Sequence, residues 1–170
     1  PLIASFVVGL ILGDLPAAMT VGIALQIMYM GNVTPGGAVA WDLSYATYIG
    51  TAGALVFGAG METTQLIGLA VVFAGIGGLV GQLMWNVSYA LNLPLNRIAQ
   101  KYAAEGATKK MYIPNVVLGQ LIGFLCRAIP ALIVLTSMTA ASQQADFASL
   151  IPGWVTQALS IFGGMMAALG

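Results

Sequence analysis

Residues 63–96 read TTQLIGLAVVFAGIGGLVGQLMWNVSYALNLPLN and contain no Asp, Glu, Lys or Arg. A helix of about 20 apolar residues crosses the hydrocarbon core of a bilayer, which is about 30 Å thick. This stretch is long enough to do so, and it predicts a transmembrane helix from about Thr64 to Leu91. Small residues between Ala74 and Gly81 recur four apart, a spacing that lets a second helix backbone pack closely.

The rest of the chain has the same apolar character. Only 6% of its 170 residues are charged and 59% are hydrophobic, whereas a soluble domain is about 25% charged. Other runs with almost no charge predict further spans at residues 1–13, 43–61, 111–143 and 147–170. We therefore predict an all-α, polytopic membrane helical bundle and exclude a soluble globule.

The predicted domain organisation is a single membrane domain over residues 1–170. The chain begins at Pro1 without an initiator Met and stops at Gly170 inside an apolar run. We interpret it as a fragment of a longer membrane protein.

Four of the five basic residues lie in one loop, at about residues 92–111: Arg97, Lys101, Lys109 and Lys110. The positive-inside rule predicts that this loop is cytoplasmic. Arg97, Lys101 and Glu105 are spaced by four and would share one face of a short interfacial helix ending at Gly106. The loop could be a simple topology anchor or a docking surface for a cytoplasmic partner.

A turn-forming stretch interrupts the N-terminal half. Residues 31–41 read GNVTPGGAVAW and precede Asp42, and Gly, Pro and Asn cannot easily continue a helix. We predict a broken or re-entrant segment around residues 31–42. Irregular backbone at membrane depth is tolerated only where it lines a cavity or is buried in protein, and broken helices supply solute sites in transporters.

Two carboxylates flank this half of the chain, and each has a simple structural interpretation. Asp42 precedes an apolar run and could cap a helix that starts at Leu43, or contact a solute, or do both. Asp14 is followed by Pro16, which favours an N-cap. Gln26 lies within an apolar helix and could contact a ligand or bond a neighbouring helix.

Polar groups of several kinds therefore converge on one region of an apolar chain. The candidate substrate-binding residues are Asp42, Gln26, Asn32, Thr34, Gly36, Gly37 and Trp41. Carboxylate, amide and hydroxyl groups beside an aromatic ring suit the hydroxyls and C–H faces of a sugar. An alkali cation would use the same residue types, so this chemistry does not separate the two ligands.

Arg127 is the other charge expected inside a span, and Pro130 should kink the same helix. A central Arg costs about 2.5–3.5 kcal/mol on insertion scales, so it should face a carboxylate, carbonyls or a polar cavity. Asp42 and Asp14 are the candidate partners. Together, Asp14 and Arg127 are candidate structural or gating charges.

Residues that carry catalysis are missing. The chain has no His, and its single Cys126 lies in an apolar span where a thiol stays protonated. We find no metal-binding cluster, phosphate-binding loop or nucleophile triad. The sequence predicts a binding or conducting subunit without a cofactor, not an enzyme, and no nucleic-acid partner.

Several blocks of sequence resemble a known family. They are Pro1–Ala4 with Val8–Asp14, Ile23–Gly31, Thr34–Gly37 with Trp41–Asp42, Arg127–Val134, and Ile151–Pro152 through Phe162–Met165. In this order they resemble the membrane IIC component of the mannose/fructose/sorbose family of bacterial phosphotransferase systems.

This resemblance implies a sugar-translocating, multi-pass subunit of the bacterial inner membrane. It implies a IID membrane partner and IIA and IIB phosphocarrier proteins, which would perform the phosphoryl transfer from phosphoenolpyruvate. We also expect a homo-oligomer. Two alternatives stay open: an ABC-type permease subunit, because Tyr102–Ala107 weakly resembles an ATPase-docking loop, and an ion-coupled small-solute carrier.

Overall fold

The computed structural model describes residues 1–30, 42–144 and 152–168, and within these ranges it contains helices and no strand. The helices are α1 (Leu2–Leu12), α2 (Leu15–Met30), α3 (Leu43–Phe57), α4 (Thr63–Ala104), α5 (Thr108–Tyr112), the π-helix η2 (Ile113–Leu118), α6 (Gly119–Gln144) and α8 (Gly153–Ala168). The prediction of an all-α fold is confirmed. Residues 31–41 of the predicted broken segment lie outside the described residues, so the prediction of a break stays untested.

Helices α1 and α2 form a hairpin whose turn is defined by two residues. Gly13 ends α1 with a φ of 81°, in the left-handed region that favours glycine. The Asp14 side chain then accepts a hydrogen bond from the Ala17 amide at 3.1 Å, which confirms it as the N-cap of α2. The hairpin packs on α3, where the Ser5 and Thr51 hydroxyls hydrogen-bond at 2.8 Å in the interior.

Helices α3 and α4 approach each other through glycines, as the small-residue spacing predicts. A Cβ placed on Gly77 would lie 2.7 Å from the Ile49 Cβ, and one on Gly81 would lie 2.6 Å from the Asp42 Cβ. Neither position has room for a side chain. This contact places the start of α3 directly against α4.

Helix α4 continues well past its predicted end. Its 42 residues correspond to roughly 63 Å, and it runs through Pro94 as far as Ala104. The prediction of a separate interfacial helix is therefore wrong, because Arg97 and Lys101 are good helix formers that extend the preceding helix. The chain turns at Gly106, with φ 69°. A helix was expected to end at Gly106, and α4 ends two residues earlier, at Ala104.

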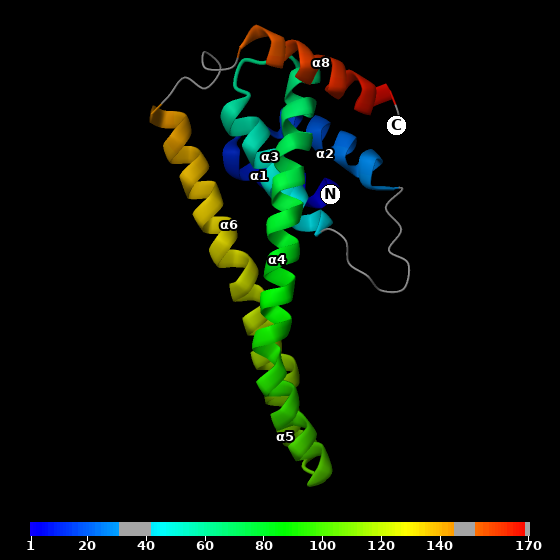
Figure 1. Ribbon diagram of the computed structural model, residues 1–170, viewed down its shortest axis with the longest axis vertical. Helices are drawn as coiled ribbons and strands as arrows, with labels where there is room; N and C mark the ends of the chain where they lie inside the picture. The colour runs from blue at the N-terminus through cyan, green and yellow to red at the C-terminus, as the bar shows by residue number, and fades with distance from the viewer. Residues whose placement is uncertain (31–41, 145–151, 169–170) are drawn as a thin grey trace.

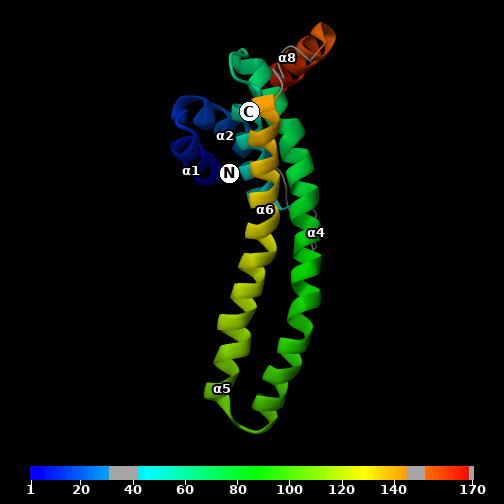
Figure 2. The same ribbon diagram turned by 90° about the vertical axis from the view of Figure 1, so that its left-hand side faces the viewer.

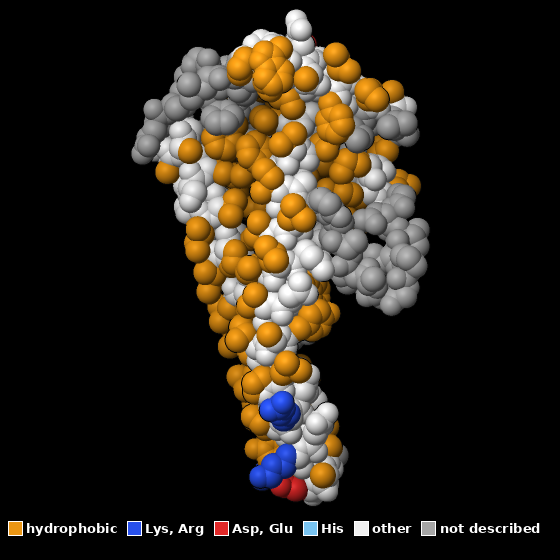
Figure 3. Space-filling model, viewed as in Figure 1, with side chains coloured by type: hydrophobic (Ala, Val, Ile, Leu, Met, Phe, Trp, Pro, Cys, Tyr) orange, Lys and Arg blue, Asp and Glu red, His pale blue; other side chains and the backbone are white. Residues whose placement is uncertain are grey.

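The long helix α4 and the run from α5 through α6 lie side by side as a helical hairpin (Figures 1 and 2). The basic residues predicted to form a loop gather at the tip of this hairpin, at the lower end of Figure 3. Near that end, η2 replaces a regular α-helical segment directly before Gly119. This π-helix was not predicted from the sequence.

Helix α8 crosses the N-terminal part of α4 (Figure 1). The crossing is close because Gly68 lies against Leu159 and Gly163 lies against the Thr64 carbonyl. The Thr64 and Ser160 hydroxyls are 3.2 Å apart across the same contact. Helix α8 has 16 residues, fewer than the span predicted over residues 147–170.

The outer surface is apolar, as expected for a protein in lipid. Figure 3 shows hydrophobic side chains over much of the visible face, and Ile3 and Ile11 are 80% and 76% exposed. Helix α4 and the stretch Lys109–Gln143 are long and apolar enough to cross a bilayer. Together with the all-helical fold, these features describe a membrane helical bundle.

Packing at the α3–α4 contact can be tested with Gly50→Ala. The new Cβ would lie 2.8 Å from the Ala70 carbonyl oxygen and 2.8 Å from the Ala74 Cβ, so we expect a loss of about 1–3 kcal/mol in stability. Gly75→Ala is the matched control, because nothing lies within 4 Å of its Cβ position. Thermal unfolding in detergent should show a lower Tm for the first variant only. Equal Tm values would contradict the close contact.

Candidate functional site

A cavity of about 570 Å³ lies between α3, α4 and α6. It combines aromatic rings, amides, hydroxyls and one pair of opposite charges. The lining residues are Asp42, Ser44, Tyr45, Tyr48, Trp85, Ser88, Tyr89, Asn92, Gly119, Gln120, Gly123, Phe124, Arg127, Ala128 and Ala131. In a membrane protein this apolar, such a set marks the candidate functional site.

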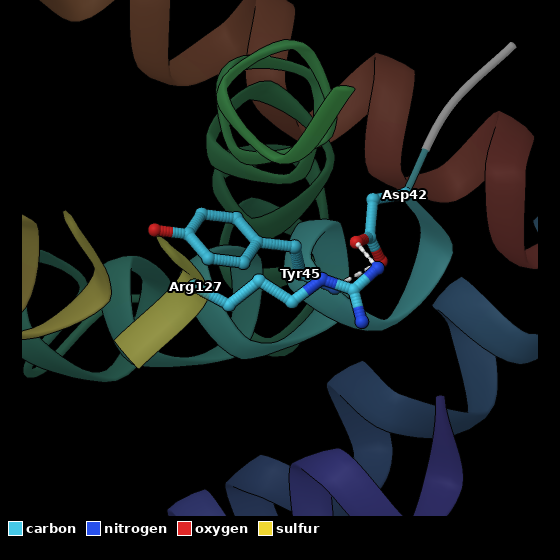
Figure 4. Close-up of polar contacts among 3 residues, drawn as sticks. All are labelled: Asp42, Tyr45 and Arg127. Atoms are coloured by element: carbon cyan, nitrogen blue, oxygen red, sulfur yellow. Dashed lines mark hydrogen bonds and ion pairs between the residues drawn. The ribbon is translucent and has the colours of Figure 1, made fainter. Parts of the chain in front are cut away.

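The two charged residues of the cavity pair with each other (Figure 4). Nη2 of Arg127 lies 2.8 Å from Oδ2 of Asp42, and the Asp42 side chain is only 6% exposed. The other carboxylate oxygen accepts a hydrogen bond from the Tyr45 amide at 3.0 Å and so caps α3. Asp42 is thus both an N-cap and the ion-pair partner of Arg127, and the pair ties the start of α3 to the middle of α6.

Arg127 has a second contact on α4. Its guanidinium carbon lies 4.1 Å from the centre of the Trp85 ring, which is a cation–π geometry. Trp85 in turn stacks on Tyr89 with ring centroids 5.4 Å apart. Arg127 therefore links α3, through Asp42, with the aromatic side chains of α4.

The remaining polar groups leave hydrogen-bonding capacity unused. Asn92 donates from Nδ2 to the Ser88 carbonyl at 2.9 Å, which leaves its side-chain oxygen as an acceptor. The Tyr45 hydroxyl is buried and has no hydrogen-bond partner among the described residues. Figure 4 shows this hydroxyl pointing away from the charge pair. The cavity offers donors and acceptors beside aromatic rings that are partly open, since Tyr89 is 60% exposed.

Most of these lining residues were not predicted from the sequence, although the sequence contains a pattern that points to them. Ser88, Tyr89 and Asn92 lie three, four and seven positions after Trp85, which places all four on one face of a helix. Gln120 and Gly123 stand seven and four positions before Arg127 on α6 and lie on one face in the same way. A polar and aromatic stripe inside an uncharged run could have indicated a cavity wall.

The structure assigns the predicted site residues to different places. Asp42 and Arg127 line the cavity together. Gln26 is half-buried on α2 and is not among the described lining residues. Asp14 caps α2 and lines a separate cavity of about 160 Å³. The remaining predicted residues, namely Asn32, Thr34, Gly36, Gly37 and Trp41, lie outside the described residues.

These features define a class: an α-helical membrane protein that holds a polar, charge-paired cavity between its helices. Over residues 1–170 the chain matches the family described as the PTS system sorbose-specific IIC component, and it belongs to that family. The family resemblance inferred from sequence is thereby confirmed.

Three curated relatives illustrate this membership. The chain is 31% identical to the PTS system mannose-specific EIIC component of Escherichia coli strain K12. It is 30% identical to the PTS system sorbose-specific EIIC component of Klebsiella pneumoniae. It is 31% identical to the fructose permease IIC component of Bacillus subtilis strain 168. Each alignment covers 100% of this chain and 60% or 61% of the relative, so the chain spans about three fifths of their length.

The charge pair makes a stability prediction. Arg127→Met would leave the Asp42 carboxylate buried without its partner. We expect the free energy of unfolding to fall by about 3 kcal/mol. This is the low end of the range for a buried pair, because Arg127 is partly exposed. The Asp42→Asn/Arg127→Met double variant should lose less than the sum of the two single variants. Denaturation in detergent measures all three. Strictly additive losses would show that the two groups do not interact.

Proposed function

We propose that this chain is the sugar-binding, membrane-spanning part of a phosphotransferase-system permease. Its family is that of IIC components, and the names of three relatives refer to mannose, sorbose and fructose. The observation that carries the proposal is the polar and aromatic cavity between α3, α4 and α6. The sugar would cross the bacterial inner membrane through this part of the protein.

The cavity chemistry fits a sugar well. A sugar presents hydroxyls that donate and accept hydrogen bonds and C–H faces that lie against aromatic rings. Asn92 and Gln120 would supply amide groups, while the exposed ring of Tyr89 would supply an apolar platform. Asp42 and Arg127 would bind hydroxyls with the groups that their pairing leaves free.

The segment before Asp42 supplies the rest of the proposed site. Asn32, Thr34 and Trp41 would add an amide, a hydroxyl and an aromatic ring, and Gly36 and Gly37 would present backbone groups. Gln26 belongs to the same proposal as a ligand on α2. Movement of this segment against a scaffold formed with the partner would carry the sugar across.

Partner proteins would complete the transport system. A IID subunit would share the membrane, and IIA and IIB proteins would carry the phosphoryl group, with the last transfer to the incoming sugar on IIB. The basic tip of the hairpin, including Arg97 and Lys101, would face the cytoplasm. We also propose a homo-oligomeric assembly. Family membership favours this function over an ABC permease subunit or an ion-coupled carrier.

Tyr89 and Tyr112 provide a matched test of the cavity. Both side chains are 60% exposed, but only Tyr89 lines the cavity. Loss of an aromatic contact is worth about 0.5–1.5 kcal/mol, so Tyr89→Leu should weaken sugar binding by about two- to tenfold. Tyr112→Leu should bind normally. Equilibrium binding to the purified complex measures both, and equal affinities would place the sugar elsewhere.

The predicted contacts of the N-terminal half have their own test. We expect Asp42→Asn and Gln26→Ala to lower phosphoenolpyruvate-dependent sugar uptake in correctly inserted complexes. The first change removes the carboxylate charge that pairs with Arg127, and the second removes an amide that would contact the sugar. Glu62→Gln serves as the control, since Glu62 is at the start of α4 and does not line the cavity. Normal uptake and affinity in both variants would remove these residues from the site.

A further inference from the structure

The hairpin of α4 and α6, seen along its length in Figure 2, contains a weak point in each arm. In α4 the weak point is Pro94, which lies inside the helix and has no amide hydrogen for the Ala90 carbonyl. In the other arm it is η2, a π-helix of 6 residues that contains Pro114. Such π-helices are rare and frequently lie at functional sites. Both arms therefore bend more easily here than a regular α-helix does.

The weak points lie next to the end of the cavity that is nearer the basic tip. Asn92 and Gly119 both line the cavity. They face each other, because a Cβ placed on Gly119 would lie 3.5 Å from Oδ1 of Asn92. From this contact toward the tip, Pro94 follows on α4, and η2 ends at Leu118 in the other arm. Both weak points therefore lie between the cavity and the basic tip.

Two glycines weaken the start of α6 in the same region. A Cβ on Gly119 or Gly123 would have its nearest neighbour at 3.5 Å or 3.8 Å, respectively, which are ordinary contact distances. Gly77 and Gly81, by contrast, would meet α3 at 2.7 Å and 2.6 Å. Alanine would therefore fit at Gly119 and Gly123, and it favours a helix more than glycine does. These two glycines lower the stability of the helix beside η2 and are not needed for close packing.

The helices on the cavity side of the weak points are held in place by other elements. There α4 packs on α3, α6 and α8, and the ion pair between Asp42 and Arg127 joins α3 to α6. On the tip side, α5 packs on α4 and η2, which belong to the hairpin itself. The cavity end is thus fixed by several helices, whereas the tip is supported by the hairpin.

We propose that Pro94 and η2 form a paired hinge, at which residues 95–112 bend and open the cavity toward the cytoplasm. The straight hairpin of this structure is the closed form, with Asn92 against Gly119. In the bent form these two residues separate. This inference rests on the proposed function and adds a gate to it, because the IIB protein would have to reach the sugar from this side.

Opening can be measured as the accessibility of a cysteine in the cavity. Ser88 lines the cavity, and its Oγ would lie 3.8 Å from a Cβ on Gly123. Ser88→Cys is made in the full-length complex after all cysteines, including Cys126, are replaced by Ser. Inside-out membrane vesicles are then treated with a charged maleimide that does not cross the bilayer. Tyr112→Cys serves as the reference for reagent access, because this side chain near the tip is 60% exposed.

Four variants separate a hinge from a purely structural role. Pro94→Ala restores a regular helix in one arm, and Gly119→Ala strengthens the helix in the other. Pro94→Gly keeps a weak point without proline, since glycine is also a poor helix former. Gly75→Ala is the matched control on α4, because nothing lies within 4 Å of its Cβ position. Neither Pro94 nor Gly75 is among the described lining of the cavity, so changes there do not act by direct contact with a sugar.

Pro94→Ala and Gly119→Ala should each slow the labelling of Ser88→Cys about threefold or more, because a better helix former disfavours the bent form. Labelling of Tyr112→Cys should not change. Pro94→Ala should also lower the maximal rate of sugar uptake about threefold or more and leave the sugar affinity within about twofold of wild type. Pro94→Gly and Gly75→Ala should keep the original labelling and uptake rates.

Two failures are distinguishable. If Ser88→Cys is labelled equally fast with and without Pro94→Ala, or if Pro94→Gly slows labelling as much as Pro94→Ala does, the hinge is wrong. Binding of mannose, fructose and sorbose is measured on the same complex. If none of the three binds, the proposed function is wrong, whereas the labelling rates still decide whether the hinge opens the cavity.

Discussion

The ion pair between Asp42 and Arg127 is the interaction on which the site depends. An apolar protein in lipid has few ways to keep a carboxylate at 6% exposure, and here the guanidinium at 2.8 Å and the Tyr45 amide provide them. The same pair connects α3 with α6, and Trp85 connects it with α4. Side chains from α3, α4 and α6 that are distant in sequence thus meet around one polar cavity.

Small residues make this arrangement geometrically accessible. Lipid tails are as apolar as the helices, so packing rather than water exclusion must hold the helices together. Gly81 lets Asp42 lie directly against α4, and Gly77 does the same for Ile49. The crossing of α8 over α4 also depends on glycines, Gly68 and Gly163, which have no room for a side chain. Glycine placement in this chain is therefore a condition for the site as well as for the fold.

Sequence patterns predicted local features where the cause was local. The Asp14 cap, the close packing near Gly77 and the turn near Gly106 each follow from a few neighbouring residues, and each appears in the structure. The continuation of α4 past Pro94 was not predicted, because charged residues signalled an interface although they are good helix formers. Ligand roles for Gln26 and for residues 31–41 remain predictions.

By itself, the sequence determined that this is an α-helical membrane protein of the IIC family, because hydropathy, charge distribution and ordered motifs are properties of the chain read in one dimension. It also named two carboxylates, Asp42 and Asp14, as candidate partners of Arg127. Only the tertiary structure decided that the partner is Asp42, and that Trp85, Tyr89 and Asn92 share a cavity with them. The physical reason is that a cavity wall is assembled from faces of separate helices, whose relative rotation and depth are set by packing contacts between residues far apart in sequence.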